Sequence, residues 1–303
     1  MLSQWHTQQS VFVAFFLVSF PVVVSATKMF DLKSWWSQRS QGSSYCEQDG
    51  WEIIWSDEFN GAELDTAFWT KEIRPPGNSR TRLATGTLEN VYLEDGALVL
   101  KSNGTWNQTS NQWEGLTSGA VDSKGKVSFQ GPTRVCVSAK LPGRGKTESG
   151  CEQQGQGIWP AHWLMPDDAS CWPCHGEIDI MEMINADGNV YGYYHWCNGG
   201  VCGDDQSLGG QVPDSCCPNP ELLFTEYHEY AVQYGYPNQG PIFSFEGTPW
   251  SQVDGSQANT FSEVPYYMIL NTAVGGNWPG PPNQDTIFPT YHYIDWIRVA
   301  QPK

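Results

Sequence analysis

The sequence is a series of short runs of apolar and β-branched residues, most of them separated by Gly, Pro, Asn or Asp. Such runs are typical of strands, and the separating residues favour the tight turns that connect them. No convincing long helix interrupts the series. Regular short strands with turn signals predict an all-β fold, a two-sheet jelly-roll sandwich. The expected strands cover residues 52–55, 88–93, 97–101, 135–141, 178–184, 190–195, 227–234, 242–245, 266–270 and 293–300.

Charge and aromatic content limit the partners of the chain. The formal net charge is −17 over 303 residues. Nucleic acid and anionic membrane surfaces both require basic patches on a protein, so neither is an expected partner. The 15 Trp, 13 Tyr and 13 Phe offer flat faces that suit the apolar faces of sugar rings, although we expect most of them in the core. Neutral polymers therefore remain the open class of partner.

The N-terminus predicts secretion. An apolar run over residues 11–24 is followed by the small residues Ser25 and Ala26, which indicates a signal peptide over 1–26. Residues 1–10 contain no Lys or Arg, so an uncleaved membrane anchor is the alternative. A polar, Ser- and Gln-rich stretch over 27–45 is the expected linker. A single folded domain would then occupy 46–303, in an extracellular or cell-wall protein.

Nine cysteines fit the oxidising compartment that a signal peptide implies. Cys171-Trp-Pro-Cys174 has the spacing of a redox or zinc motif, but it opens no helix and has no second Cys-x-x-Cys. We therefore expect disulfides that staple loops, with one cysteine free or paired outside the chain because the number is odd. Asn103 and Asn107 each begin an Asn-x-Thr sequon and are predicted glycosylation sites on an exposed loop.

Three carboxylates, Glu177, Asp179 and Glu182, lie within one apolar run. A strand projects successive side chains to opposite faces, so Glu177 and Asp179 share a face while the adjacent isoleucines point into the core. Strict alternation would bury Glu182. We therefore predict one extra residue, a β-bulge at Ile180 or Met181, that returns Glu182 to the acidic face. A solvated edge strand is the alternative, but the apolar neighbours favour a central strand.

This arrangement suits the cleavage of glycosidic bonds. Like charges held close together cannot all ionise freely, so one carboxyl should be ionised and another protonated near neutral pH. Retaining glycosidases need a nucleophile and an acid/base whose carboxyl groups lie roughly 5 to 5.5 Å apart, whereas inverting enzymes leave a wider gap for water. An ideal strand would hold residues five apart farther from each other, so a curved strand is required.

The acids and their flanks resemble glycoside hydrolase family 16. The resemblance rests on Gly157-Ile-Trp-Pro-Ala-His-Trp-Leu164, Trp172-Pro173 and Gly176-Glu-Ile-Asp-Ile-Met-Glu182. The two residues between Asp179 and Glu182 are similar to the form seen in laminarinase-like endo-β-1,3-glucanases. Further segments follow in the family's order, at residues 55–61, 117–119, 139–142, 227–232, 275–278 and 294–299.

The resemblance implies a jelly roll of the concanavalin A type, whose concave sheet forms a substrate cleft, and a retaining double displacement that needs no cofactor. By position, Glu177 would be the nucleophile and Glu182 the general acid/base. Asp179 would be the helper that hydrogen-bonds the nucleophile and holds its pKa down, while its charge keeps Glu182 protonated.

Other residues take their expected roles from the same resemblance and from their places near the acids. Glu58 and Asp295 fall where family members often hold a structural calcium, with surface or capping carboxylates as the alternative. Many relatives carry Arg where this chain has Ala120, so one sugar contact is expected to be absent. We expect substrate contacts from Trp159, Trp163, His195, Trp278, Asn90 and Trp196, although Trp163 could equally be core and His195 structural.

The sequence therefore predicts a secreted, monomeric hydrolase whose partner is β-glucan and which cuts β-1,3- or mixed β-1,3/1,4-glucan internally. Transglycosylation, or hydrolysis of another β-linked polysaccharide, would use the same acids and is the alternative. A non-catalytic glucan-binding protein is disfavoured, because such proteins lack one or more of the acids that are all present here.

Overall fold

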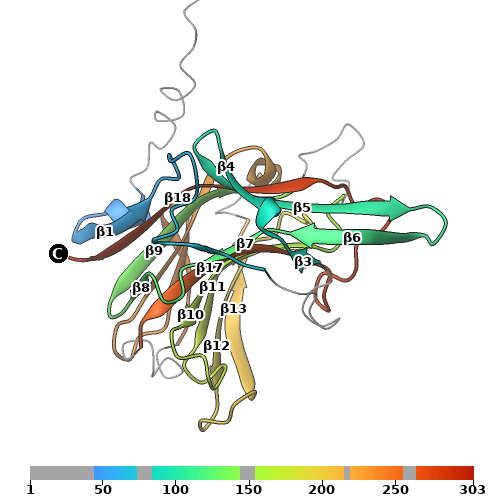
Figure 1. Cartoon of the computed structure of the whole chain (residues 1–303). Coiled ribbons are helices and arrows are strands. Elements are labelled where there is room, and N and C mark those ends of the chain that lie inside the picture. Colours follow the sequence, from blue (N-terminus) through green and yellow to red (C-terminus); the bar gives the residue numbers. More distant parts are fainter. Residues whose placement is uncertain (1–43, 74–83, 144–153, 215–218, 255–263) are drawn as a thin grey trace, which may run out of the picture. The chain divides into compact units, whose positions relative to one another are not determined.

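The computed structural model describes residues 44–73, 84–143, 154–214, 219–254 and 264–303. The expected signal peptide, nearly all of the expected linker, and Cys151, Cys216 and Cys217 lie outside the described residues. Within them the chain forms two sheets, which confirms the predicted all-β jelly roll (Figure 1). No helix in this part of the chain is long and apolar enough to cross a membrane.

The first sheet has ten strands among the described residues, in the order β16-β15-β14-β9-β18-β5-β6-β3, with β1 also paired to β18 and β4 to β5. All of its pairings are antiparallel except that of β3 with β6. Its strands are β1 (Trp51–Asp57), β3 (Thr85–Gly86), β4 (Val91–Glu94), β5 (Ala97–Asn107), β6 (Gln112–Ser118), β9 (Thr133–Lys140), β14 (His228–Tyr234), β15 (Ile242–Phe245), β16 (Thr248–Gln252) and β18 (Thr290–Pro302).

The second sheet has eight described strands, in the order β13-β12-β11-β10-β17-β7-β2, with β8 paired to β17. Three short 3₁₀ helices complete the described elements: η1 (Tyr45–Glu47), η2 (Leu88–Asn90) and η3 (Pro220–Phe224). The strands of this sheet are β2 (Thr70–Lys71), β7 (Ala120–Asp122), β8 (Ser128–Phe129), β10 (Ile158–Pro166), β11 (Glu177–Glu182), β12 (Tyr191–Cys197), β13 (Asp205–Gln211) and β17 (Tyr266–Val274).

One hydrophobic core joins the two sheets. Leu98 and Val137 of the first sheet belong to the same buried cluster as Ile178 and Leu270 of the second. Because side chains alternate along a strand, the residues between these core positions point to the opposite face of each sheet. Strand β11 has β10 on one side and β12 on the other, so it is a central strand and the edge-strand alternative is excluded.

Two histidines form a polar contact inside this core. His162 of β10 and His292 of β18 are completely buried, and their Nε2 atoms lie 2.9 Å apart. The rings are stacked, with centroids 4.9 Å apart. Burial lowers the pKa of both rings, that of His292 to about 3, so the pair is neutral and one ring donates to the other.

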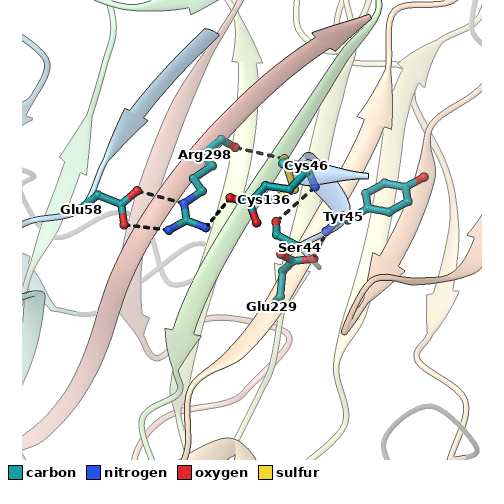
Figure 2. Close-up of polar contacts among 8 residues, drawn as sticks. Ser44, Tyr45, Cys46, Glu58, Cys136, Glu229 and Arg298 are labelled. Atoms are coloured by element: carbon teal, nitrogen blue, oxygen red, sulfur yellow. Dashed lines mark hydrogen bonds and ion pairs between the residues drawn. A yellow bond between two sulfur atoms is a disulfide. The ribbon is translucent and has the colours of Figure 1, made fainter. Parts of the chain in front are cut away.

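The first described residues, Ser44 to Cys46, bind to the outer face of the first sheet through a disulfide and hydrogen bonds (Figure 2). A disulfide joins Cys46 to Cys136 of β9. The backbone amide of Tyr45 donates to the buried Glu229 carboxylate at 2.9 Å, and the Ser44 hydroxyl accepts from the Cys46 amide at 3.2 Å. Tyr45, expected as the last residue of the linker, is thus a buried part of the folded unit.

Candidate active site

The predicted bulge lies where the sequence places it. Asp179 pairs with Tyr193 of β12, but Glu182 pairs with Tyr191, so β11 uses one residue more than its partner between these two pairs. The register with β10 shifts at the same place. Ile180 and Met181 both point into the core. The bulge therefore restores Glu182 to the face that carries the other two acids.

An indole donates a hydrogen bond to each glutamate. Trp172, in the loop before β11, donates through Nε1 to Glu177 Oε2 at 2.5 Å. Trp159 of β10 donates through Nε1 to Glu182 Oε1 at 2.9 Å. A hydrogen bond to the charged form of a carboxyl favours that form, so each indole opposes the effect of burial on its glutamate.

His195 lies between two carboxylates. Its Nε2 is 3.1 Å from Asp179 Oδ2, and its Nδ1 is 2.8 Å from Asp205 Oδ1 at the start of β13. Burial opposes protonation of the ring, but Asp179, Glu177 and Asp205 together outweigh burial and raise the pKa of His195 to about 10. The ring is therefore an imidazolium at neutral pH.

Both glutamates are held toward the protonated form. Burial and then the Asp179 charge raise the pKa of Glu177 to about 8 and that of Glu182 well above its usual range. The expectation that Asp179 lowers the pKa of Glu177 is therefore wrong in the free protein, because its negative charge acts in the opposite direction. The charge on His195 and the Trp172 hydrogen bond are the two effects that favour ionised Glu177.

Aromatic side chains gather beside Glu182. Trp278, which is 40% exposed, lies edge-on to Trp159 with ring centroids 5.5 Å apart and to Tyr191 at 5.3 Å. Tyr193 stacks on Tyr191 at 6.4 Å. Trp159, Trp278 and His195, all expected from the sequence, are thus close to the acids.

Trp163 also faces the acids. It pairs directly with Asp179 across β10 and β11, and its Nε1 donates to Asn271 Oδ1 at 2.7 Å. Ala120 pairs with Asn271 on the far side of β17. The position where many relatives carry Arg is therefore close to the Trp163 contact, and it holds only a methyl group.

One expected substrate contact, Trp196, is not placed for that role. Trp196 packs against the hydrophobic core and stacks on Tyr194 at 5.4 Å, on the face of β12 opposite His195. Asn90 is 5% exposed at the end of η2, and its contact with substrate stays a prediction. The expectation for Trp196 fails because the sequence does not fix which face a residue takes beside a strand end.

Disulfides and further polar and aromatic residues surround the acids. Disulfides Cys171–Cys202 and Cys174–Cys197 tie the Trp172 loop to β12 and to the segment before β13, which confirms the predicted stapling. Tyr191, Tyr193 and Asp205 lie on neighbouring strands of the same sheet. The Trp-Pro pair inside the Cys-x-x-Cys motif was a visible signal for Trp172, whereas Asp205 had none.

The expected calcium ligands do not fit a calcium ion. Arg298 donates through Nε and Nη2 to the two carboxylate oxygens of Glu58, both at 3.0 Å (Figure 2). Asp295 is half-buried close to the same pair, and this partial burial raises its pKa. With both oxygens of Glu58 occupied by a guanidinium, the charge that calcium would supply is already present.

The described residues also form two cavities, of about 190 and 310 Å³. None of the candidate active-site residues lines either of them. The only cluster of His, Cys, Asp and Glu with the spacing of a metal site in the described ranges is Glu177, Asp179 and His195, whose ligand atoms lie within 4.8 Å. Because the imidazolium already balances these carboxylates, we assign no metal to them.

The geometry agrees with comparisons to known proteins. A family model described as "XgeA-like, catalytic GH16 domain" matches residues 152–209, which include all three acids, Trp172, His195 and Asp205. The laminarinase catalytic domain from Thermotoga maritima MSB8 superposes with a TM-score of 0.68 at 28% identity, over 84% of this chain and 100% of that chain. This chain belongs to glycoside hydrolase family 16.

Curated relatives of this family 16 chain differ in what their names say they cut. Glucan endo-1,3-beta-glucosidase A1 of Niallia circulans is 33% identical over 275 residues, 82% of this chain and 38% of that protein. Keratan-sulfate endo-1,4-beta-galactosidase of Sphingobacterium multivorum is 31% identical over 259 residues, 82% of this chain and 55% of that protein. The chain thus spans about two fifths and about half of these relatives.

Proposed function

We propose that this family 16 domain is a secreted, retaining endo-β-1,3-glucanase that also accepts mixed β-1,3/1,4-linked glucan. The observation that carries the proposal is the bulged strand β11, which presents Glu177, Asp179 and Glu182 on one face in a chain related to named glucanases. The Rhodothermus marinus protein named Beta-glucanase, 26% identical over 82% of this chain, supports the same substrate class.

The proposed reaction is a double displacement. Ionised Glu177 attacks the anomeric carbon, and the bond to the leaving oxygen breaks as Glu182 gives that oxygen its proton. The glycosyl ester on Glu177 is then hydrolysed by a water that Glu182 deprotonates, and the product keeps its anomeric configuration. Burial, and after it the charge of Asp179, raise the pKa of Glu182 and hold it protonated in the free protein.

Stacking residues on both sides of the acids support internal cutting of a polymer. Trp159, Trp278 and Tyr191 lie beside Glu182, and Trp172 lies beside Glu177. Sugar rings stack on such aromatic faces. A chain that is bound on both sides of the broken bond is cut at internal positions.

Secretion is proposed on three observations. Residues 1–26 have the pattern of a signal peptide, the described residues contain three disulfides, and Asn103 and Asn107 lie in sequons. Asn107 is at the tip of the β5–β6 hairpin, whereas Asn103 is within β5.

A β-linked galactan is the second candidate substrate. The relative named for keratan sulfate is nearly as similar as the glucosidase, and the methyl group of Ala120 replaces an expected Arg contact. Transfer to a sugar acceptor instead of water would use the same acids.

Product analysis on laminarin, barley mixed-link glucan, xyloglucan and agarose tests the proposal, with short laminari-oligosaccharides added as acceptors. We expect short β-1,3-oligosaccharides whose new reducing ends are first formed in the β configuration, as proton NMR reports. Glu177→Gln should lose about 10³-fold or more in kcat, and exposed Glu52→Gln should not. Attack on agarose alone, or products longer than the substrate, would overturn glucan hydrolysis in favour of a galactanase or a transferase.

A further inference from the structure

Each ring nitrogen of His195 lies against a carboxylate oxygen. Asp205 lies 2.8 Å from Nδ1, and Asp179 lies 3.1 Å from Nε2. A carboxylate oxygen attracts an N–H group, and an imidazolium carries one on each ring nitrogen, so the charged ring suits both contacts. The arrangement is a chain of three groups, Asp205–His195–Asp179, that ends between the two glutamates.

The register of three neighbouring strands places these groups. His195 of β12 pairs with Glu177 of β11 on one side and with Ser207 of β13 on the other. Asp205 is two residues before Ser207, so it projects on the same face, diagonally across from the ring. Its pairing partner is Cys197, which the disulfide to Cys174 fixes.

The side chains of Asp179, His195 and Asp205 differ in how far they are buried. The Asp179 side chain is 5% exposed, that of His195 20% and that of Asp205 37%. The outer carboxylate is thus partly solvated, and the cost of burying charge falls mainly on the inner pair. Glu177 and Asp179 of β11, Asp205 of β13, Tyr193 of β12 and the Trp172 loop are the groups that face the ring.

We propose that Asp205 is a positioning residue for glycosidic bond cleavage, which orients the His195 ring against Asp179, the acid between the two glutamates. The proposal rests on the proposed glycosidase function. Without Asp205, the ring would lose one of the carboxylates that favour its charged form. The ring would also lose the contact at Nδ1 that fixes its orientation, so its Nε2 would no longer be held against Asp179.

Asp205→Ala is the test, with kcat and KM measured on whichever polymer the wild type cuts. We expect kcat to fall about tenfold with KM changed less than twofold, because Asp205 acts through His195. We also expect His195 to titrate at least about one pH unit lower, followed by NMR of ¹³C-labelled histidine and assigned with His195→Gln. Asp205→Glu should restore both quantities, and Asp205→Asn should fall in between.

Glu246→Gln is the matched control, because Glu246 Oε1 lies 3.2 Å from His228 Nδ1 in the other sheet and should affect neither quantity. Thermal melts confirm folding, and Asp205→Asn replaces Asp205→Ala if that variant does not fold. An unchanged His195 titration, or unchanged kcat despite a shifted titration, overturns the proposal in an active enzyme. A wild type that cuts no glycan overturns the proposed function, and the titration still shows whether Asp205 holds His195.

Discussion

At the residue scale, the site is governed by what offsets the burial of its acids. Burial and Asp179 favour the protonated form of Glu177, while His195 and the Trp172 hydrogen bond favour the charged form that attack on the sugar requires. Trp159 has the corresponding effect on Glu182. Burial and Asp179 prevail at both glutamates, and at Glu182 they keep an acid ready to protonate the leaving oxygen.

Trp172→Phe should make Glu177 harder to ionise, since the ring remains but the N–H donor is lost. The hydrogen bond lowers the pKa of Glu177, so its removal raises that pKa. The acid limb of the kcat/KM profile should therefore move to higher pH, by about 0.5 to 1 unit, with about a three- to tenfold loss of kcat/KM on that limb.

Trp113→Phe provides the control, because its Nε1 donates to the Asn283 carbonyl at 2.6 Å, away from the acids. An acid limb that stays in place in Trp172→Phe would show that this hydrogen bond does not set the ionisation of Glu177.

The three acids could be predicted from the sequence, and Asp205 could not. Ionisable residues in an apolar, β-branched run are costly unless they have a function, and this isolates Glu177, Asp179 and Glu182. Asp205 lies in a polar, Gly-containing segment more typical of a loop. Its contact with His195 exists only through the register of β12 and β13, which no local pattern specifies.

At the scale of elements, the bulge in β11 was predictable because a buried Glu182 would conflict with strand alternation. Strand β13 was not, since its residues, Asp205–Gln211, include two glycines and a single large apolar side chain. It forms as an edge strand because β12 provides a partner for its backbone. The prediction that Trp196 contacts the substrate was wrong for a related reason, since core packing decides which face of β12 its side chain takes.

The disulfides near the site should matter more for activity than for stability. Cys174–Cys197 closes a separation of 23 residues beside His195, whereas Cys46–Cys136 closes 90 residues on the other sheet. In the chain-entropy description a longer loop gives the larger stabilisation, roughly 3.5 against 4.5 kcal/mol.

The Cys174→Ser/Cys197→Ser variant should therefore lose about tenfold in kcat at 25 °C, while Cys46→Ser/Cys136→Ser should show the larger fall in Tm with kcat nearly unchanged. Calorimetry measures Tm and initial rates measure kcat for the two variants. Equal losses of kcat in both would show that the site disulfide has no specific role.

At the scale of the whole domain, the two sheets are joined by an apolar core that contains one neutral histidine pair. His292 has a folded pKa of about 3, below the ordinary value of 6.5. Between these values the unfolded chain binds a proton that the folded protein excludes, so the free energy of unfolding falls as the pH is lowered from 6.5 toward 3.

This pair should cost roughly 3 kcal/mol of stability at pH 4 relative to pH 7, from His292 alone. The His162→Leu/His292→Leu variant should therefore lose less stability than the wild type over that interval, measured by urea unfolding at both pH values. The contributions of Glu177 and Glu182 are common to both proteins and cancel in the comparison. His228→Gln, at the first residue of β14, serves as the control. An equal loss of stability in the double variant and the wild type would contradict the role given to the histidine pair.

The central claim is that Glu177 is the nucleophile and Glu182 the acid/base on a single bulged strand. A 2-deoxy-2-fluoro laminaribioside with a good leaving group slows hydrolysis of the glycosyl ester more than its formation, so the ester accumulates and can be located by mass spectrometry of peptides. We predict one added disaccharide, attached to Glu177, in the wild type, and none in Glu177→Gln. Attachment to Glu182 or Asp179, or no ester while the substrate is turned over with inversion, would contradict the account.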